Sequence, residues 1–166
     1  FSPSRETSKP GFPSRFIIPC SEDVVLVCTG ADRVEFLQNQ LTCDLMHLVE
    51  NRFLLGAYCN PKGRVLATLR LYSTPDSIQL VTHRSIADAL LSRLRMYILR
   101  ADVEICLAEN VAILCVGGFA NEDLGVKGKV FTCPVFDSDL LANHGTLVIG
   151  EITDLFDCWN SLTSNT

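Results

Sequence analysis

The sequence predicts an α+β fold, because strand-like and helix-like segments follow one another without the regular alternation that parallel sheets require. Residues 64–72 alternate apolar and polar side chains, which is the period of a half-buried strand. Residues 84–100 repeat apolar side chains at helical spacing instead. A turn with proline and glycine over residues 60–63 joins two of the strands into a hairpin.

The first elements are an extended arm, a strand and a short helix. The proline-rich residues 1–19 are expected to form the arm. Residues 24–29 are an apolar run of strand length. Asp32 and Glu35 then have the spacing of a capping box, with Asp in the place of the usual Ser or Thr. We therefore predict a helix over residues 32–41.

The hairpin comes next and is followed by a third strand. Proline fixes φ early in the turn and Gly63 tolerates a positive φ at its end, so residues 53–59 and 64–72 should pair. A third strand is predicted over residues 78–82. On the second strand of the hairpin, one face should carry Val65, Ala67, Leu69 and Leu71, and the other Thr68 and Arg70.

The longest helix is predicted over residues 84–100. At about 100° per residue, its apolar arc consists of Ile86, Leu90, Leu91, Leu94, Tyr97 and Ile98. The remaining predicted elements are strands over residues 103–107, 111–116 and 146–150 and a last helix over residues 152–162.

Composition and charge exclude several classes of protein. With 48% hydrophobic and 20% charged residues, the chain is globular and not disordered. Its net charge of -5 argues against direct binding to nucleic acid, since such proteins are normally basic. No apolar run approaches the roughly 20 residues of a membrane-spanning helix. We therefore expect neither a membrane protein nor a nucleic-acid binder.

The chain has eight cysteines, none of them in a C-x-x-C pair. A long apolar chain without a secretion signal is typical of a protein that keeps its thiols reduced, so we expect a cytoplasmic location. Cluster ligands usually have short spacings, and we expect neither an iron–sulfur cluster nor a zinc site. The cysteines are Cys20, Cys28, Cys43, Cys59, Cys106, Cys115, Cys133 and Cys158.

Two polar segments have the chemistry of a ligand site. Residues 38–45 offer amides, a hydroxyl and a carboxylate that suit a heterocycle with many donors and acceptors, or else they are a polar helix end. Residues 59–64 carry Lys62 and Arg64, which suit an anionic ligand tail, or else they are a solvated hairpin tip. The candidate ligands in the first segment are Gln38, Gln40, Thr42 and Asp44.

These two segments together resemble a known family. G-A-D at residues 30–32 and F-L-Q-N-Q-L-T-C-D at residues 36–44 resemble the G-A-D … F-L-Q-G-Q-L-T-x-D opening of YgfZ-type folate-binding proteins. C-N-P-K-G-R at residues 59–64 is similar to the C-x-x-K-G-R/K hairpin of that family. The resemblance covers most of residues 20–119 and extends to Trp159. The family is related to the T-protein of the glycine cleavage system, which transfers a one-carbon unit to tetrahydrofolate.

The resemblance implies a T-protein-like folate-binding fold, of which this chain is the N-terminal half. Residues 20–50 and 107–166 would form a first folate-binding α+β domain. Residues 51–106 would begin a second, ferredoxin-like domain, and the rest of that domain and a C-terminal barrel would lie outside the sequence. The family motif K-G-C-Y/F-x-G-Q-E is absent from these 166 residues.

The resemblance also implies a function. The protein would bind tetrahydrofolate or another folate and act in tRNA modification and the maintenance of iron–sulfur enzymes, which would be indirect partners. The folate contacts would come from the two polar segments and from Trp159, which would stack on the pterin or aminobenzoate ring or else serve as a core anchor. The implied folate ligands are Gln38, Gln40, Thr42, Asp44, Lys62, Arg64 and Trp159.

Two other functions compete with that reading. One is a folate-dependent aminomethyltransferase, since the T-protein uses an acidic side chain on the strand after the hairpin. Here the matching positions are Ala67 and Thr68, and no Asp or Glu occurs from Asn51 to Pro75, so no carboxylate is available there. The second alternative is an interaction scaffold whose folate pocket has been lost.

Overall fold

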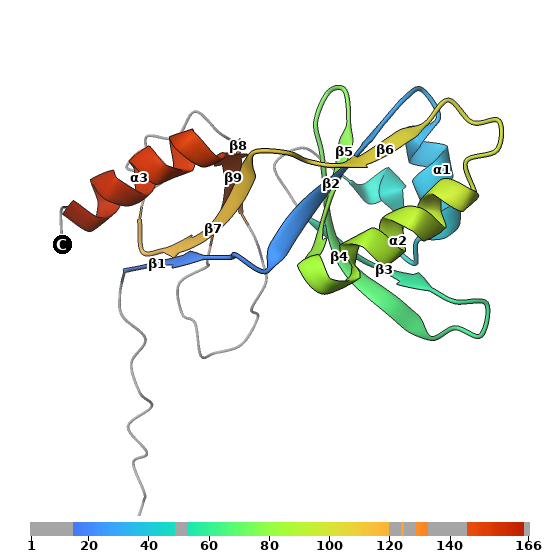
Figure 1. The fold of residues 1–166 in the computed structure, drawn as a ribbon, viewed down its shortest axis with the longest axis horizontal. Helices are drawn as coiled ribbons and strands as arrows, with labels where there is room; N and C mark the ends of the chain where they lie inside the picture. Colours follow the sequence, from blue (N-terminus) through green and yellow to red (C-terminus); the bar gives the residue numbers. More distant parts are fainter. Residues whose placement is uncertain (1–14, 49–52, 120–123, 125–128, 133–145, 165–166) are drawn as a thin grey trace, which may run out of the picture.

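The computed structural model describes residues 15–48, 53–119, 124, 129–132 and 146–164. The chain forms two antiparallel sheets that follow one another along the long axis of the molecule (Figure 1). This arrangement of mixed helices and sheets confirms the predicted α+β class.

The larger sheet has five strands in the order β3-β4-β5-β2-β6, and every neighbouring pair is antiparallel. One face packs against helices α1 (Arg33–Gln40) and α2 (Arg84–Met96), and the side chains between them form the main core. The strands are β2 (Asp23–Thr29), β3 (Leu54–Cys59), β4 (Val65–Ser73), β5 (Ile78–His83) and β6 (Glu104–Leu107).

Helix α2 confirms the predicted helix but ends four residues earlier, at Met96. It buries Ala87, Leu90, Leu91 and Leu94, which share one helical face. The last turn tightens, because Tyr97 N donates to Leu94 O at 3.0 Å. Arg95 then donates from Nε and Nη2 to Ile105 O at 3.0 and 2.7 Å, which ties the helix end to the outer strand β6.

Helix α1 confirms the helix predicted over residues 32–41, but its cap differs from the expected one. The Asp32 side chain makes no capping hydrogen bond to the helix. Its Oδ2 instead accepts from Asp102 N at 2.8 Å, and Asp102 Oδ2 accepts from Ala31 N at 3.1 Å. The capping-box prediction was therefore wrong, because a distant segment competes for the carboxylate.

The predicted hairpin is confirmed as β3 and β4. Asn60 Oδ1 accepts from Lys62 N at 2.9 Å and from Arg64 N at 3.0 Å, and Gly63 has a φ of 76°. On β4, the face toward the helices is buried at Ala67, Leu69 and Leu71. Val65, predicted on that face, is 57% exposed, because the hairpin projects beyond the helices at this point.

The smaller sheet has four strands in the order β1-β7-β9-β8 and carries helix α3 (Ile152–Ser164). Its first strand was missed in the sequence, where residues 1–19 were expected to be an arm without secondary structure. Residues 16–19 pair with β7, and a proline is tolerated at the end of such an edge strand. Residues 1–14 lie outside the described part. The strands are β1 (Phe16–Pro19), β7 (Val111–Gly117), β8 (Lys129–Thr132) and β9 (Thr146–Glu151).

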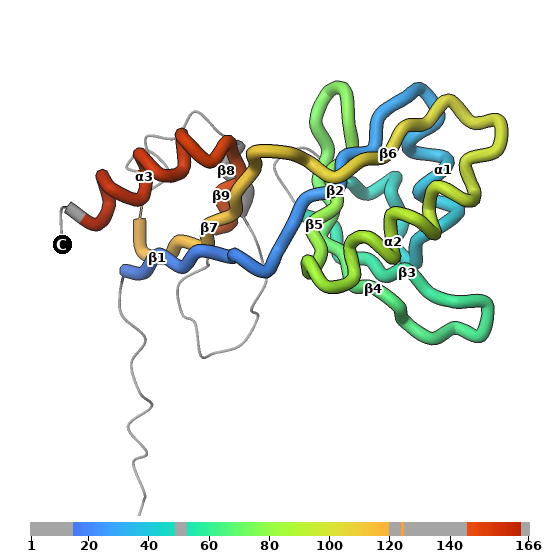
Figure 2. Tube along the Cα trace, viewed as in Figure 1, coloured from blue at the N-terminus to red at the C-terminus, as the bar shows by residue number. Residues whose placement is uncertain are grey.

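The chain passes between the two sheets twice, from β1 to β2 and from β6 to β7 (Figure 2). A second apolar cluster joins the sheets and includes Val25, Tyr72 and Val81 from the larger one and Ile113 and Ile149 from the smaller one. The sheets thus divide the chain differently from the expected grouping of residues 20–50 with 107–166. β2 hydrogen-bonds to β5 and β6, so it shares a sheet with most of residues 51–106. The expected domain division stays a prediction.

No helix in the described part of the chain is long and apolar enough to cross a membrane.

Candidate functional site

The polar segment after α1 lies along the outer edge of β3. Leu41 forms an isolated bridge with Tyr58. Thr42 N donates to Ala57 O, and Ala57 N donates to Thr42 Oγ1, both at 3.0 Å. These bonds place the segment beside the hairpin and cover part of the outer edge of β3.

Three of the predicted folate ligands use their side chains to hold this local structure. Besides the Thr42 hydroxyl, Gln38 Oε1 accepts from Leu45 N at 2.7 Å. Asp44 Oδ1 accepts from Met46 N at 3.0 Å and so caps a 3-10 turn (Leu45–His47). Each of these oxygens already accepts a hydrogen bond, so a structural role accounts for all three residue types.

Gln40 lines an open pocket of about 300 Å³ between α1 and the chain after α2. The pocket has two carboxylates and two amides, with the Tyr97 ring at its side. Such a lining offers mainly acceptors and suits a neutral or cationic ligand rather than an anion. The lining residues are Asp32, Glu35, Phe36, Asn39, Gln40, Tyr97 and Ala101.

Lys62 and Arg64 lie at the tip of the hairpin, and both are exposed. Their backbone amides are fixed by Asn60, but the side chains extend into solvent, where charge pairing is weak. Neither side chain lines the pocket that contains Gln40.

Trp159 lies in α3 and is half-buried against the smaller sheet. It lines an apolar pocket of about 310 Å³. Helices α1 and α3 lie toward opposite ends of the molecule, so the structure does not bring Trp159 together with the polar segment after α1 (Figure 1). The other residues of this pocket are Pro19, Ala112, Leu114, Ile152, Leu155 and Phe156.

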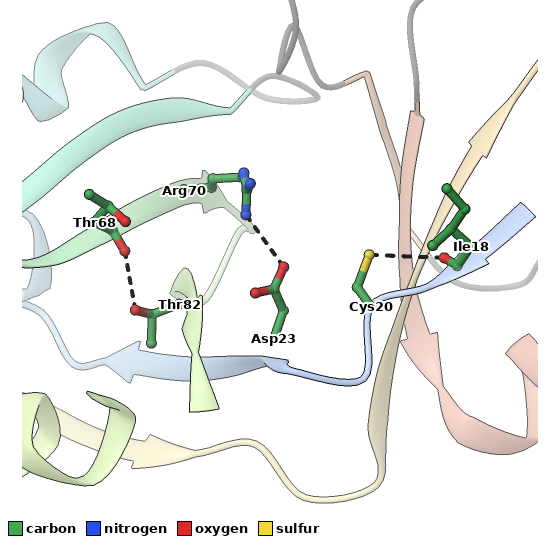
Figure 3. Close-up of polar contacts among 6 residues, drawn as sticks. All are labelled: Ile18, Cys20, Asp23, Thr68, Arg70 and Thr82. Atoms are coloured by element: carbon green, nitrogen blue, oxygen red, sulfur yellow. Dashed lines mark hydrogen bonds and ion pairs between the residues drawn. The ribbon is translucent and has the colours of Figure 1, made fainter. Parts of the chain in front are cut away.

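Ala67 and Thr68, the two positions that the family resemblance aligns with the acidic side chain of the T-protein, face in opposite directions on β4. Ala67 is 3% exposed and packs in the main core under the helices. Thr68 is exposed on the opposite face, and its carbonyl accepts from Thr82 Oγ1 at 3.1 Å (Figure 3). Of these two positions, position 68 is the one whose side chain is exposed on the sheet surface.

A polar cluster that the sequence analysis did not identify lies on the same face, where the two sheets meet. Arg70 Nη1 is 3.4 Å from Asp23 Oδ2, and their side chains are 30% and 23% exposed (Figure 3). Burial raises the pKa of the Cys20 and Cys115 thiols, and the positive charge of the Arg70 guanidinium partly opposes this rise. The alternation along β4 predicted which face Arg70 lies on. Its partner Asp23 could not be predicted in the same way, because it lies on β2, two strands away in the sheet.

The seven described cysteines are free thiols, and Cys133 lies outside the described part. Burial raises the pKa of the Cys20 and Cys28 thiols from 9.0 to about 11. No group of three or more His, Cys, Asp or Glu side chains in the described residues is arranged to hold a metal ion. The absence of a metal centre in the protein stays a prediction.

The raised pKa values predict slow thiol chemistry at Cys20 and Cys28. A rise from 9.0 to about 11 leaves roughly a hundredth of the thiolate, which is the reactive form. At pH 8 we expect iodoacetamide to modify exposed Cys106 first, with peptide mass spectrometry as the readout. Modification of Cys28 as fast as Cys106 would contradict this expectation.

The same raised pKa values make the stability of the fold depend on pH. As the pH rises from 9 toward 11, the Cys20 and Cys28 thiols of the unfolded chain lose protons that the folded chain keeps, so the free energy of unfolding should fall.

No protein-family model matches the sequence. Individual curated relatives do match, and they carry the same description. The tRNA-modifying protein YgfZ of Hamiltonella defensa is 37% identical over 116 residues, which are 69% of this chain and 34% of that protein. The YgfZ protein of Sodalis glossinidius is 32% identical over 148 residues, covering 83% of this chain and 44% of its own. The chain therefore spans less than half the length of these curated relatives.

A solved structure has the same fold. The crystal structure of the glycine cleavage system aminomethyltransferase T from Bartonella henselae matches with a TM-score of 0.72 at 15% identity. The match covers 89% of this chain and 45% of that one, and at this identity it shows the fold alone. Sequence and structure together confirm the family resemblance: the chain is a homologue of the YgfZ-type tRNA-modifying proteins and has the fold of the T-protein.

Proposed function

We propose that this chain is the folate-binding part of an accessory protein for tRNA modification that carries out no one-carbon transfer itself. The observation that carries the proposal is the similarity to YgfZ proteins, which are described as tRNA-modifying, on a fold shared with an aminomethyltransferase. The folate is tetrahydrofolate or a close derivative. Iron–sulfur enzymes of tRNA modification are the indirect beneficiaries, and the protein acts in the cytoplasm.

The face of the larger sheet that bears Thr68 is the best candidate for contact with the folate. It lies opposite the helix-covered face, beside the sheet junction, and it carries both apolar and polar side chains. Such a mixture suits a flat heterocycle with a polar rim, because binding sites combine apolar contact with a few placed polar groups. Lys62 and Arg64 remain candidates at its margin, whereas Gln40, on the helix-covered side, and Trp159, on α3, would each need a separate contact.

Binding of folate is tested by isothermal titration calorimetry of the purified protein with tetrahydrofolate under anaerobic conditions. We expect saturable binding by the wild type. Trp159→Phe should bind equally well if the ligand lies on the Thr68 face, because that tryptophan belongs to the smaller sheet. Loss of binding in Trp159→Phe would move the site to the apolar pocket, and no heat of binding in the wild type would refute the folate proposal.

The role in tRNA modification has its own measurement. Thiomethylated nucleosides in bulk tRNA from a strain that lacks the protein should fall, as measured by mass spectrometry of nuclease digests. Re-expression of the wild type should restore them. Unchanged nucleoside levels in the deletion strain would separate folate binding from tRNA modification and refute the second part of the proposal.

A further inference from the structure

The face of the larger sheet away from the helices is covered by the smaller sheet in only one part. Near the β2 and β5 side, Val25 and Val81 are buried in the cluster that joins the two sheets. On β4 the cluster also buries Tyr72, whereas from Arg70 toward the hairpin tip the same face stays accessible. We call this part the open face and define it by two cross-strand pairs, Leu55 with Arg70 and Ala57 with Thr68.

The open face carries a positive charge and no acid of its own. The first pair contributes Leu55, which is 63% exposed, and Arg70. No Asp or Glu occurs in the whole of residues 51–75, so β3 and β4 supply none. Within the described part of the chain, the carboxylate that contacts Arg70 is that of Asp23 on β2. A ligand that lies across Thr68 therefore meets the guanidinium of Arg70. In the T-protein, by resemblance, a ligand at this place meets an acidic side chain instead.

Among the described residues, the contact between Arg70 and Asp23 leaves most N–H donors of the guanidinium without a hydrogen-bond acceptor. Charge-assisted hydrogen bonds between nitrogen and oxygen are typically about 2.7–2.9 Å long, and this one is 3.4 Å. It engages Nη1 alone, out of about five N–H donors that the group has. Since the side chain is only 30% exposed, solvent screens its charge less than it screens a charge at the hairpin tip.

We infer that Arg70 is the anion-recognition residue of the open face and holds a carboxylate of the ligand beside Thr68. The inference rests on the proposed folate binding, in which the carboxylates belong to the glutamate tail of the folate. It places the anion contact at Arg70 on the face of β4 instead of at Lys62 and Arg64, which lie at the exposed hairpin tip. Asp23 then competes with the ligand for the same guanidinium.

The test compares two ligands by calorimetry: tetrahydrofolate, which has the glutamate carboxylates, and 6-methyltetrahydropterin, which has none. Arg70→Gln should weaken tetrahydrofolate binding by about ten- to a hundredfold, as expected for a hydrogen bond to a charged group. Binding of the pterin should be unchanged. Arg70→Lys keeps the charge without the planar fork and should give an intermediate loss.

Two further variants sharpen the experiment. Asp23→Asn removes the competing carboxylate and should tighten tetrahydrofolate binding, whereas a purely structural ion pair would lose affinity or stability on either substitution. Arg93→Gln removes an exposed charge from α2 and is the matched control. Circular dichroism melting of each variant shows that it is folded.

The outcomes separate the two proposals. Wild-type affinity in Arg70→Gln, or an equal loss for both ligands, overturns the role of Arg70 while folate binding itself stands. A larger loss in Lys62→Gln or Arg64→Gln than in Arg70→Gln returns the anion contact to the hairpin tip. A wild type that binds neither ligand overturns the folate proposal as a whole, including the role of Arg70.

Discussion

Replacing Gly30 with alanine should lower the free energy of unfolding by more than about 3 kcal/mol, or prevent folding altogether. Gly30 joins β2 to α1 with a φ of 101°, a backbone conformation that side chains with a Cβ rarely adopt. A Cβ at this position would also overlap the Asp102 carbonyl, with its carbon only 2.7 Å away and Val103 Cα 2.9 Å away. Both neighbours are backbone atoms and cannot move aside as a flexible side chain would.

The overlap matters because this turn is tied to the segment before β6. Asp32 N donates to Asp102 O at 3.1 Å, and the side chains of Asp32 and Asp102 each accept an amide proton from the other segment. Pushing the two segments apart would break all three hydrogen bonds. Each is worth about 0.5–1.5 kcal/mol in net terms, and the backbone strain adds to their loss.

Gly63→Ala is the matched control. Its φ of 76° is also positive, but no atom lies within 4 Å of the added Cβ, so the change should cost only about 1 kcal/mol of backbone strain. Urea unfolding followed by circular dichroism measures both variants. Equal, small effects of the two substitutions would show that the contact between residues 30 and 102 is not a fixed part of the fold.

The second large effect concerns catalysis. We expect the protein to transfer an aminomethyl group to tetrahydrofolate at least about 10²–10⁴-fold more slowly than a T-protein, because a positioned acid or base is typically worth that much. The exposed position that would carry the acid is Thr68, and a hydroxyl cannot replace the carboxylate at neutral pH. Arg70 on the same face adds a positive charge, which disfavours the charged amine of the aminomethyl carrier.

The assay uses tetrahydrofolate and an aminomethylated carrier protein, with a T-protein as the positive control. Thr68→Asp should stay folded, because the side chain points away from the core. Ala67→Asp should unfold the protein or reduce its stability strongly, because an unpaired carboxylate would be buried at a site that is 3% exposed. Turnover by the wild type comparable to that of a T-protein would show that another residue supplies the acid.

The elements that the sequence predicted correctly are those with a strong local signal. Helix α2 has four buried residues on one helical face, and β4 alternates clearly between buried and exposed side chains. The hairpin turn has both proline and a glycine with positive φ. Here the local preference and the packing of the whole fold agree, so a single sequence carries enough information.

The failures come from contacts between residues that are distant in the sequence. The Asp32 carboxylate accepts a hydrogen bond from Asp102 N instead of capping its own helix. Residues 16–19 form a strand only because β7 lies next to them. Gln38 and Thr42 stay predicted ligand contacts, and in the fold their side chains accept backbone hydrogen bonds. Composition alone does not tell these roles apart, since the same polar groups suit both.

The order of the strands has a consequence for how the molecule assembles. β1 and β7 are neighbours in the smaller sheet, but the whole larger sheet lies between them in the chain. Pairing them early would mean closing a very long loop before any contact offsets the lost chain entropy. Once the larger sheet has formed, its β2 and β6 are neighbours and bring the ends of β1 and β7 together. We therefore expect the larger sheet to form before the smaller one.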